Sequence, residues 1–130
     1  MSRYCGAVWP LSPDEVDRYT MGCCFLLTWA LEQVATRLRL SSGKIVLCWE
    51  RAVDDRDALH AGYLTASGQV VDATGVYPLA EFITTYSTDG WDCAIVPINV
   101  LEENGYVFPE DVGSHDEAIG VAERLTSFLA

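Results

Sequence analysis

The chain has few basic residues, with eight lysines and arginines against nineteen aspartates and glutamates in 130 residues. Lysine occurs once, as Lys44. The formal net charge is −11 and the sequence pI is about 4.3. Because this charge repels a phosphate backbone, the composition argues against direct binding to nucleic acid and favours basic proteins as partners.

Long apolar runs are also missing, and none approaches the roughly 18 residues of a membrane-spanning helix. The N-terminal sequence, MSRYCGAVWPLSPDE, lacks the apolar segment of a signal peptide. We therefore expect a soluble, cytoplasmic protein with no membrane partner. The 130 residues are enough to bury one core, and no internal repeat divides them, so residues 1–130 are predicted to form a single domain.

The five cysteines do not have the spacing of a structural zinc site. No C-x-x-C pair occurs, and the histidines are His60 and His115. The count of cysteines is odd, and a disulfide between adjacent Cys23 and Cys24 would be badly strained. A reducing compartment is therefore expected, with no metal and no cofactor.

The apolar pattern predicts an α+β fold in which helices flank a small antiparallel sheet. Ser12-Pro13-Asp14-Glu15 has the pattern of a capping box at the start of a short helix. A longer helix is predicted over residues 23–40, followed by Ser41-Ser42-Gly43 as its C-terminal stop. Its buried face consists of residues at helical spacing: Cys24, Leu27, Leu31, Val34 and Leu38.

The strands predicted after this helix are short and rich in β-branched residues. They cover residues 44–49, 60–65, 69–72 and 93–98, with a tight turn at Gly68 and an edge position for Pro97. A short helix is predicted over 77–86 after a turn at 73–76. A C-terminal helix is predicted to begin with a second capping box at Ser114-His115-Asp116-Glu117.

Three residues in this arrangement have the types that a cysteine hydrolase needs. Cys24 lies at the start of the long helix, where a thiolate is favoured. His60 begins one strand of the predicted hairpin and Asp72 ends the other, an even separation compatible with one face of the sheet. A thiol, a base and a group that orients the base make up a nucleophilic triad. Each residue also has an ordinary structural role open to it, as core packing, a satisfied buried histidine or a turn former.

The segments that carry these residues resemble a known superfamily. The stretches are Cys24-Phe-Leu-Leu-Thr-Trp-Ala-Leu31, His60-Ala-Gly-Tyr-Leu and Gly68-Gln-Val-Val-Asp72-Ala-Thr-Gly75-Val. They are similar to small bacterial and phage proteins of the papain-like cysteine-hydrolase superfamily. In these proteins a helix opens with Cys and continues to Ala-Leu, a strand begins with His, and a hairpin closes in Asp-Ala-x-Gly.

This resemblance implies a papain-like fold, with Cys24 as nucleophile, His60 as general base and Asp72 as the residue that orients His60. The reaction implied is hydrolysis or acyl transfer at an amide or isopeptide-type bond of a protein or peptide. Papain-like peptidases also use a Gln upstream of the Cys to bind the oxyanion. Here that region is Asp17-Arg-Tyr-Thr20, which contains no Gln. The donors to the oxyanion would then be backbone N–H groups or another side chain, or the site would have no oxyanion donor at all.

A second hypothesis is that the chain does no catalysis and binds a basic surface through its acidic residues. A phage inhibitor of the anti-CRISPR type, which blocks a nucleic-acid-binding complex, is the concrete form. The partner-binding residues in this case would be Glu102, Glu103, Glu110 and Asp111. A third hypothesis, that the chain is a small transcriptional or toxin–antitoxin partner, is supported by the charge alone. The structural alternative to all binding roles is that the acidic residues form a solvated surface that keeps the protein soluble.

Overall fold

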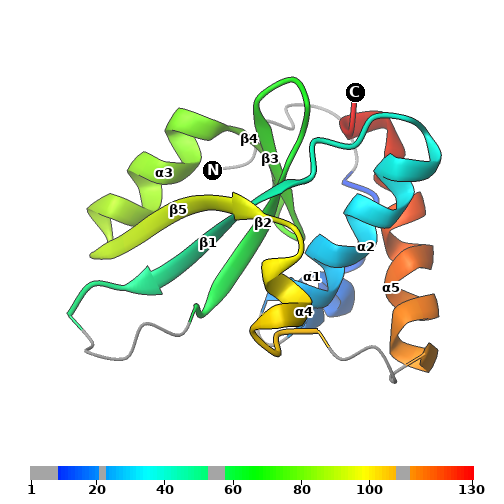
Figure 1. Cartoon of the computed structure of the whole chain (residues 1–130), viewed down its shortest axis with the longest axis horizontal. Helices are drawn as coiled ribbons and strands as arrows, with labels where there is room; N and C mark the ends of the chain where they lie inside the picture. Colours follow the sequence, from blue (N-terminus) through cyan, green and yellow to red (C-terminus); the bar gives the residue numbers. More distant parts are fainter. Residues whose placement is uncertain (1–8, 21–22, 53–57, 108–111) are drawn as a thin grey trace.

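The computed structural model describes residues 9–20, 23–52, 58–107 and 112–130, which form an α+β fold (Figure 1). The helices are α1 (Pro13–Thr20), α2 (Cys24–Arg37), α3 (Leu79–Thr88), α4 (Val100–Glu103) and α5 (Val112–Glu123), with a 3-10 turn at Thr126–Phe128. The strands are β1 (Lys44–Glu50), β2 (His60–Leu64), β3 (Gln69–Asp72), β4 (Gly75–Pro78) and β5 (Trp91–Pro97). The predicted fold class, helices around a small antiparallel sheet, is confirmed at this level.

The strands form one antiparallel sheet in the order β4-β3-β2-β1-β5. The central hairpin of β2 and β3 has Tyr63 opposite Val71, as expected for a turn at Gly68, where φ is 90°. Pro97 ends β5, an edge strand, where its missing N–H interrupts no ladder. The predicted edge position of Pro97 is therefore confirmed.

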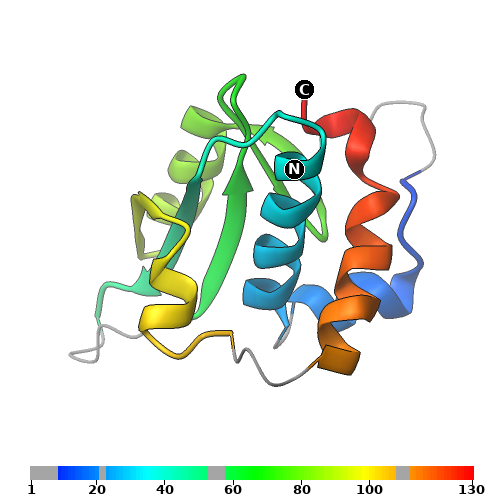
Figure 2. The ribbon, with the colours of Figure 1, turned by 45° about the vertical axis from the view of Figure 1, so that its right-hand side comes forward.

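Helices cover both faces of the sheet, as Figures 1 and 2 show. α2 packs on one face, mainly over β2, and α5 lies beside α2 on its outer side. α3 packs on the opposite face. The alternation of side chains along the strands divides the core accordingly: Ile45, Leu47 and Tyr63 lie in the cluster under α2, while Val46, Cys48 and Val70 lie in the cluster with Phe82 of α3. Within the described segments, none of the helices has the length and apolarity to cross a membrane.

The first two helices begin as predicted, but α2 ends earlier than expected. Ser12 and Glu15 form the reciprocal capping box, with Ser12 N to Glu15 Oε1 at 2.9 Å and Glu15 N to Ser12 Oγ at 3.2 Å. α2 stops at Arg37 because Arg39 adopts a φ of 60° and the Leu40 amide donates to the Ala35 carbonyl at 2.8 Å. The prediction that Leu38 is buried was therefore wrong, and this side chain is 47% exposed. The other members of the stripe are buried: Cys24, Leu27, Leu31 and Val34.

Three further elements differ from the prediction. Residues 75–78, expected to be a turn and the start of a helix, form β4, in which Val76 pairs with Val71 and Tyr77 with Val70. This pairing covers the edge of β3, and α3 consequently begins at Leu79. α5 begins at Val112, so Ser114 lies inside the helix and is not its N-cap. The short helix α4 was not predicted.

Gly62 of β2 lies where a side chain has no room. A β carbon there would be 2.4 Å from Cγ1 of Val70 and 3.5 Å from Cζ of Phe82. We expect Gly62→Ala to lower the free energy of unfolding by about 1–3 kcal/mol, measured by urea denaturation. Gly120→Ala on α5 is the control, because nothing lies within 4 Å of its added carbon. It should leave stability unchanged or raise it by up to about 1 kcal/mol, and equal destabilisation of both variants would contradict the packing.

Candidate functional site

Cys24 is the first residue of α2 and points into the protein. Its neighbour Cys23 is the N-cap, with no side-chain capping bond. Cys24 is 3% exposed, and its Sγ lies 3.9 Å from the carbonyl oxygen of Leu59, the residue before β2.

His60 and Asp72 form a buried pair at one end of the sheet. His60 begins β2, Asp72 ends β3, and both are about as buried as the core, with 5% and 4% exposed. The distance from His60 Nε2 to Asp72 Oδ2 is 3.1 Å. The sequence predicted that an imidazole and a carboxylate would meet here, and this part of the prediction is confirmed.

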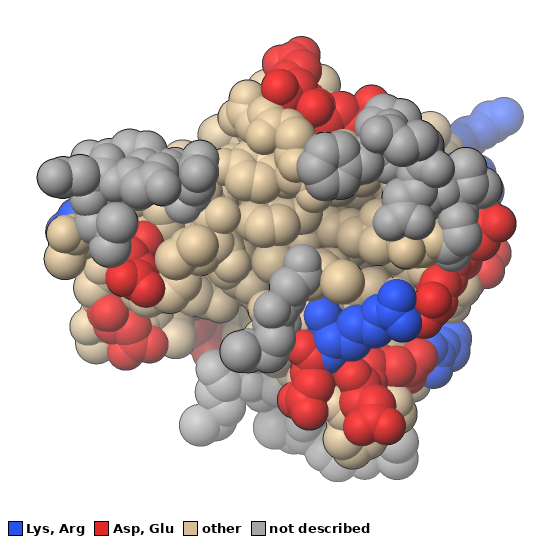
Figure 3. Space-filling view, turned by 90° about the horizontal axis from the view of Figure 1, so that it is seen from below, with Lys and Arg blue, Asp and Glu red and all other residues tan. Residues whose placement is uncertain are grey.

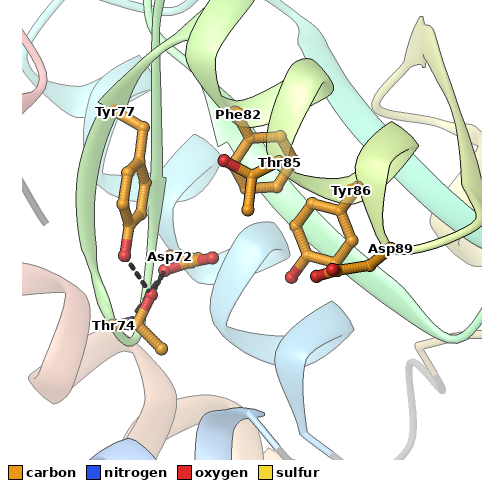
Figure 4. A pocket seen from close by; sticks show the side chains of 7 residues that line it. All are labelled: Asp72, Thr74, Tyr77, Phe82, Thr85, Tyr86 and Asp89. Carbon is orange, nitrogen blue, oxygen red and sulfur yellow. Dashed lines mark hydrogen bonds between the residues drawn. The ribbon is translucent and has the colours of Figure 1, made fainter. Parts of the chain in front are cut away.

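Asp72 is held in place by both of its carboxylate oxygens. While Oδ2 faces His60, Oδ1 accepts hydrogen bonds from the Thr74 amide at 2.8 Å and the Thr74 hydroxyl at 2.6 Å. The Tyr77 hydroxyl lies 2.6 Å from Thr74 Oγ1, which extends the chain of hydrogen bonds to β4 (Figure 4). The carboxylate therefore has a fixed orientation toward His60.

The surroundings of His60 raise its pKa. Burial on its own favours the neutral imidazole, but hydrogen bonds to Asp72 and Cys24 and the negative charge of Asp72 outweigh it and raise the pKa to about 9. The ring also stacks near Tyr86, with 5.4 Å between centroids. His60 is therefore an imidazolium at neutral pH. Since Nε2 bonds to Asp72, Nδ1 is the nitrogen left for the thiol of Cys24.

Cys24 and His60 line the same hollow, which has a volume of about 550 Å³. Its other walls come from α1, the loop before β2, α3 and β5. Figure 3 shows the molecule from below: uncharged surface occupies the middle, acidic side chains lie at the top, left and lower right, and basic side chains adjoin the acidic ones at the lower right. The residues that line the hollow are Thr20, Cys24, Phe25, Ala58, Leu59, His60, Tyr86 and Trp91.

Thr20 supplies a hydroxyl that the sequence reasoning did not assign. Its Oγ1 is buried and has no hydrogen-bond partner within the described segments, although it lines the hollow with Cys24. A buried hydroxyl without a partner is costly in a folded protein, so such a group often has a functional reason. Thr20 lies four residues before Cys24, in the region where papain-like peptidases have a Gln.

The sequence also did not identify Tyr86 and Trp91 as residues of the hollow. Aromatic residues in a helix and a strand have no sequence pattern that distinguishes the wall of a cavity from the core.

The remaining described cysteines differ from Cys24 in their surroundings. Cys48 and Cys93 are cross-strand partners on β1 and β5, with 3.4 Å between their sulfurs. Burial and the proximity of Cys93 raise the pKa of Cys48 far above its ordinary value, which keeps it a neutral thiol. Cys23 is half-buried. It does not line this hollow, and the structure records no contact between Cys23 and His60.

The residues proposed for partner binding are partly described. Glu102 and Glu103 lie exposed on α4, where Glu103 Oε2 accepts a hydrogen bond from Asn99 Nδ2 at 2.7 Å. Glu110 and Asp111 lie outside the described residues. No cluster of three or more metal-binding side chains occurs in the described part of the chain.

Comparison with known proteins gives no relative. No family model, no curated protein and no solved structure matches the chain. The function is therefore argued from the positions of Cys24, His60 and Asp72 and from the hollow around them.

The pKa of His60 gives a test of this geometry. Since the pKa in the folded protein is about 9, above the reference value of 6.5, the stabilisation from the pair is complete below pH 6.5 and is lost as pH rises through about 9. In Asp72→Asn, burial remains and the carboxylate charge is gone, so the pKa should fall below that of the native protein. The midpoint is measured from the imidazole carbon-bound proton by NMR, with His115→Gln to assign the signal. An unchanged midpoint in Asp72→Asn would contradict the pair.

Proposed function

We propose that the chain is a papain-like cysteine hydrolase or acyl transferase that acts on an amide or isopeptide-type bond. The observation that carries the proposal is the buried His60–Asp72 pair, of which His60 lines the same hollow as Cys24 at the start of α2. A thiol, a cationic imidazole and an orienting carboxylate at these positions are the parts that nucleophilic catalysis by cysteine requires.

The reaction follows from the protonation state of His60. The Cys24 thiolate, stabilised by the imidazolium, attacks the acyl carbon, and the carbonyl oxygen takes the electron pair. His60 then gives its Nδ1 proton to the leaving amine as the C–N bond breaks, which leaves a thioester on Cys24. A water molecule or an acceptor amine gives a proton to His60 and attacks the thioester, and the thiolate leaves. Asp72 keeps the imidazole oriented and stabilises its positive charge throughout.

The carbonyl oxygen that becomes negative in this step needs hydrogen-bond donors. Among the residues that line the hollow, Thr20 has a buried hydroxyl with no hydrogen-bond partner in the described part of the chain. Together with backbone N–H groups at the start of α2, it takes the role that a Gln has in papain-like peptidases.

A non-catalytic acidic inhibitor is the second candidate. It is supported by the net charge of −11 and by the exposure of Glu102 and Glu103 on α4. Such a protein would bind a basic surface of a nucleic-acid-binding complex, as an anti-CRISPR-type inhibitor does. In this case the reactivity of Cys24 would have no part in its function.

Alkylation with iodoacetamide separates the two candidates. At pH 6 the imidazolium of His60 should favour the Cys24 thiolate, so we expect Cys24 to react about tenfold faster or more than Cys23, although Cys24 is the more buried. The modified residue is located by mass spectrometry. His60→Ala should remove the difference. His115→Ala is the matched control, because this ring is tilted against Trp29, with 4.3 Å between centroids, and does not line the hollow.

Slow alkylation of Cys24, with a rate that rises only near pH 8.5 as for an ordinary thiol, would contradict the hydrolase. The same result would favour the acidic inhibitor, and a search for basic binding partners would then be the next step.

The role of Thr20 is tested with an activated ester. Thr20→Val keeps the size of the side chain and removes the hydroxyl, so hydrolysis of p-nitrophenyl acetate should slow by about 10²-fold, the usual cost of one oxyanion donor. Alkylation of Cys24 by iodoacetamide forms no oxyanion and should keep its native rate. Thr20→Ser should restore ester hydrolysis in part. Equal loss of both rates would show that Thr20 acts through packing.

A further inference from the structure

A second hollow adjoins the first on the α3 side of the sheet. It has a volume of about 240 Å³ and lies between α3 and the β3–β4 hairpin. Figure 4 shows Asp72, Thr74 and Tyr77 on the strand side and the α3 residues opposite them. The residues that line it are Asp72, Thr74, Tyr77, Phe82, Thr85, Tyr86 and Asp89.

The two hollows meet at Tyr86, which lines both of them. The Tyr86 ring lies 5.4 Å from the His60 ring, between centroids, so the second hollow begins next to the catalytic base. Asp72 links them further, because it bonds to His60 and also lines the second hollow. A substrate with its acyl group at Cys24 would reach the second hollow with a side group that runs beside the Tyr86 ring.

Asp89 supplies the negative charge of the second hollow that is not paired with the His60 imidazolium. Two carboxylates line this hollow, and among the described residues no Lys, Arg or His does. Asp72 is engaged with His60 and Thr74, whereas Asp89 is exposed at the C-cap of α3, where the helix dipole adds partial negative charge. After burial, the charge of Asp72 is among the causes that raise the pKa of Tyr86 and of Tyr77, in keeping with a negative potential in this hollow.

The walls also suit an alkyl chain that ends in a cation. Tyr77, Phe82 and Tyr86 contribute three aromatic rings to the lining. Aromatic faces attract ammonium and guanidinium groups and pack well against methylene stems. An anionic or purely polar group would gain little from the same surface.

We propose that this hollow is a subsite for the cationic side chain of a basic peptide, of the arginine or lysine type. Asp89 is the residue that determines the specificity. This inference rests on the proposed function, since it places the subsite beside the bond that Cys24 attacks. It names the substrate class as a basic peptide, which agrees with the overall charge of −11.

The test compares Nα-acetyl-L-arginine methylamide with the corresponding citrulline compound, in which a neutral urea replaces the guanidinium. Binding is measured by NMR titration of full-length Cys24→Ala protein, so that no reaction occurs. The arginine compound should bind about threefold to fivefold more tightly, as for an exposed ion pair, and should shift amide signals of α3 and the β3–β4 turn. Asp89→Asn should remove the preference. Asp116→Asn, an exposed site on α5 that lines neither hollow, should keep it.

Equal binding of the two compounds, or a preference that Asp89→Asn leaves unchanged, would overturn the subsite. Because this measurement needs no reactive thiol, its result is independent of the alkylation of Cys24. Rapid alkylation with no preference for arginine would remove the subsite and leave the hydrolase. A preference for arginine with slow alkylation would remove the hydrolase, and with it the role of this hollow as a substrate subsite.

Discussion

The hydrogen bond between His60 and Asp72 is the interaction on which the site depends. It joins the first residue of β2 to the last residue of β3, so the pairing of these strands decides whether the two side chains meet. The bond raises the pKa of His60 against the effect of burial, and it leaves Nδ1 for the thiol. The hydrogen bonds from Thr74 to the other oxygen of Asp72 fix this arrangement from the β3–β4 turn.

The two hollows are the result of a sheet with helices on both faces. α2 brings Cys24 from one face to the end of β2, and α3 brings Phe82 and Tyr86 from the other. The His60 ring lies where these contributions meet. The proposed reaction and the proposed selection of a basic side chain thus belong to two hollows that share Tyr86 in their walls.

Local signals in the sequence were sufficient for the parts of the site that lie on regular elements. The even spacing of His60 and Asp72 around the turn at Gly68 predicted their contact, and the apolar stripe of α2 predicted that Cys24 points inward. No local signal in the sequence predicted the features that tertiary contacts determine. The early end of α2 depends on a positive φ at Arg39, and an arginine in the sequence does not predict a positive φ. Residues 75–78 form a strand because the edge of β3 is available, and Thr20 and Tyr86 line the hollow because α1 and α3 pack where they do.

The alternation of side chains along β2 has a consequence for the unfolded and partly folded chain. A shift of one residue in the pairing of β2 with its neighbours would turn His60 to the α2 face and Ala61 to the α3 face, with Gly62 no longer opposite Phe82. In a slipped register His60 would lie on the face opposite Asp72, and the hydrogen bond between them could not form. The pair that the proposed chemistry needs is therefore present only once β2 has its native register, and a slipped or partly folded chain lacks it.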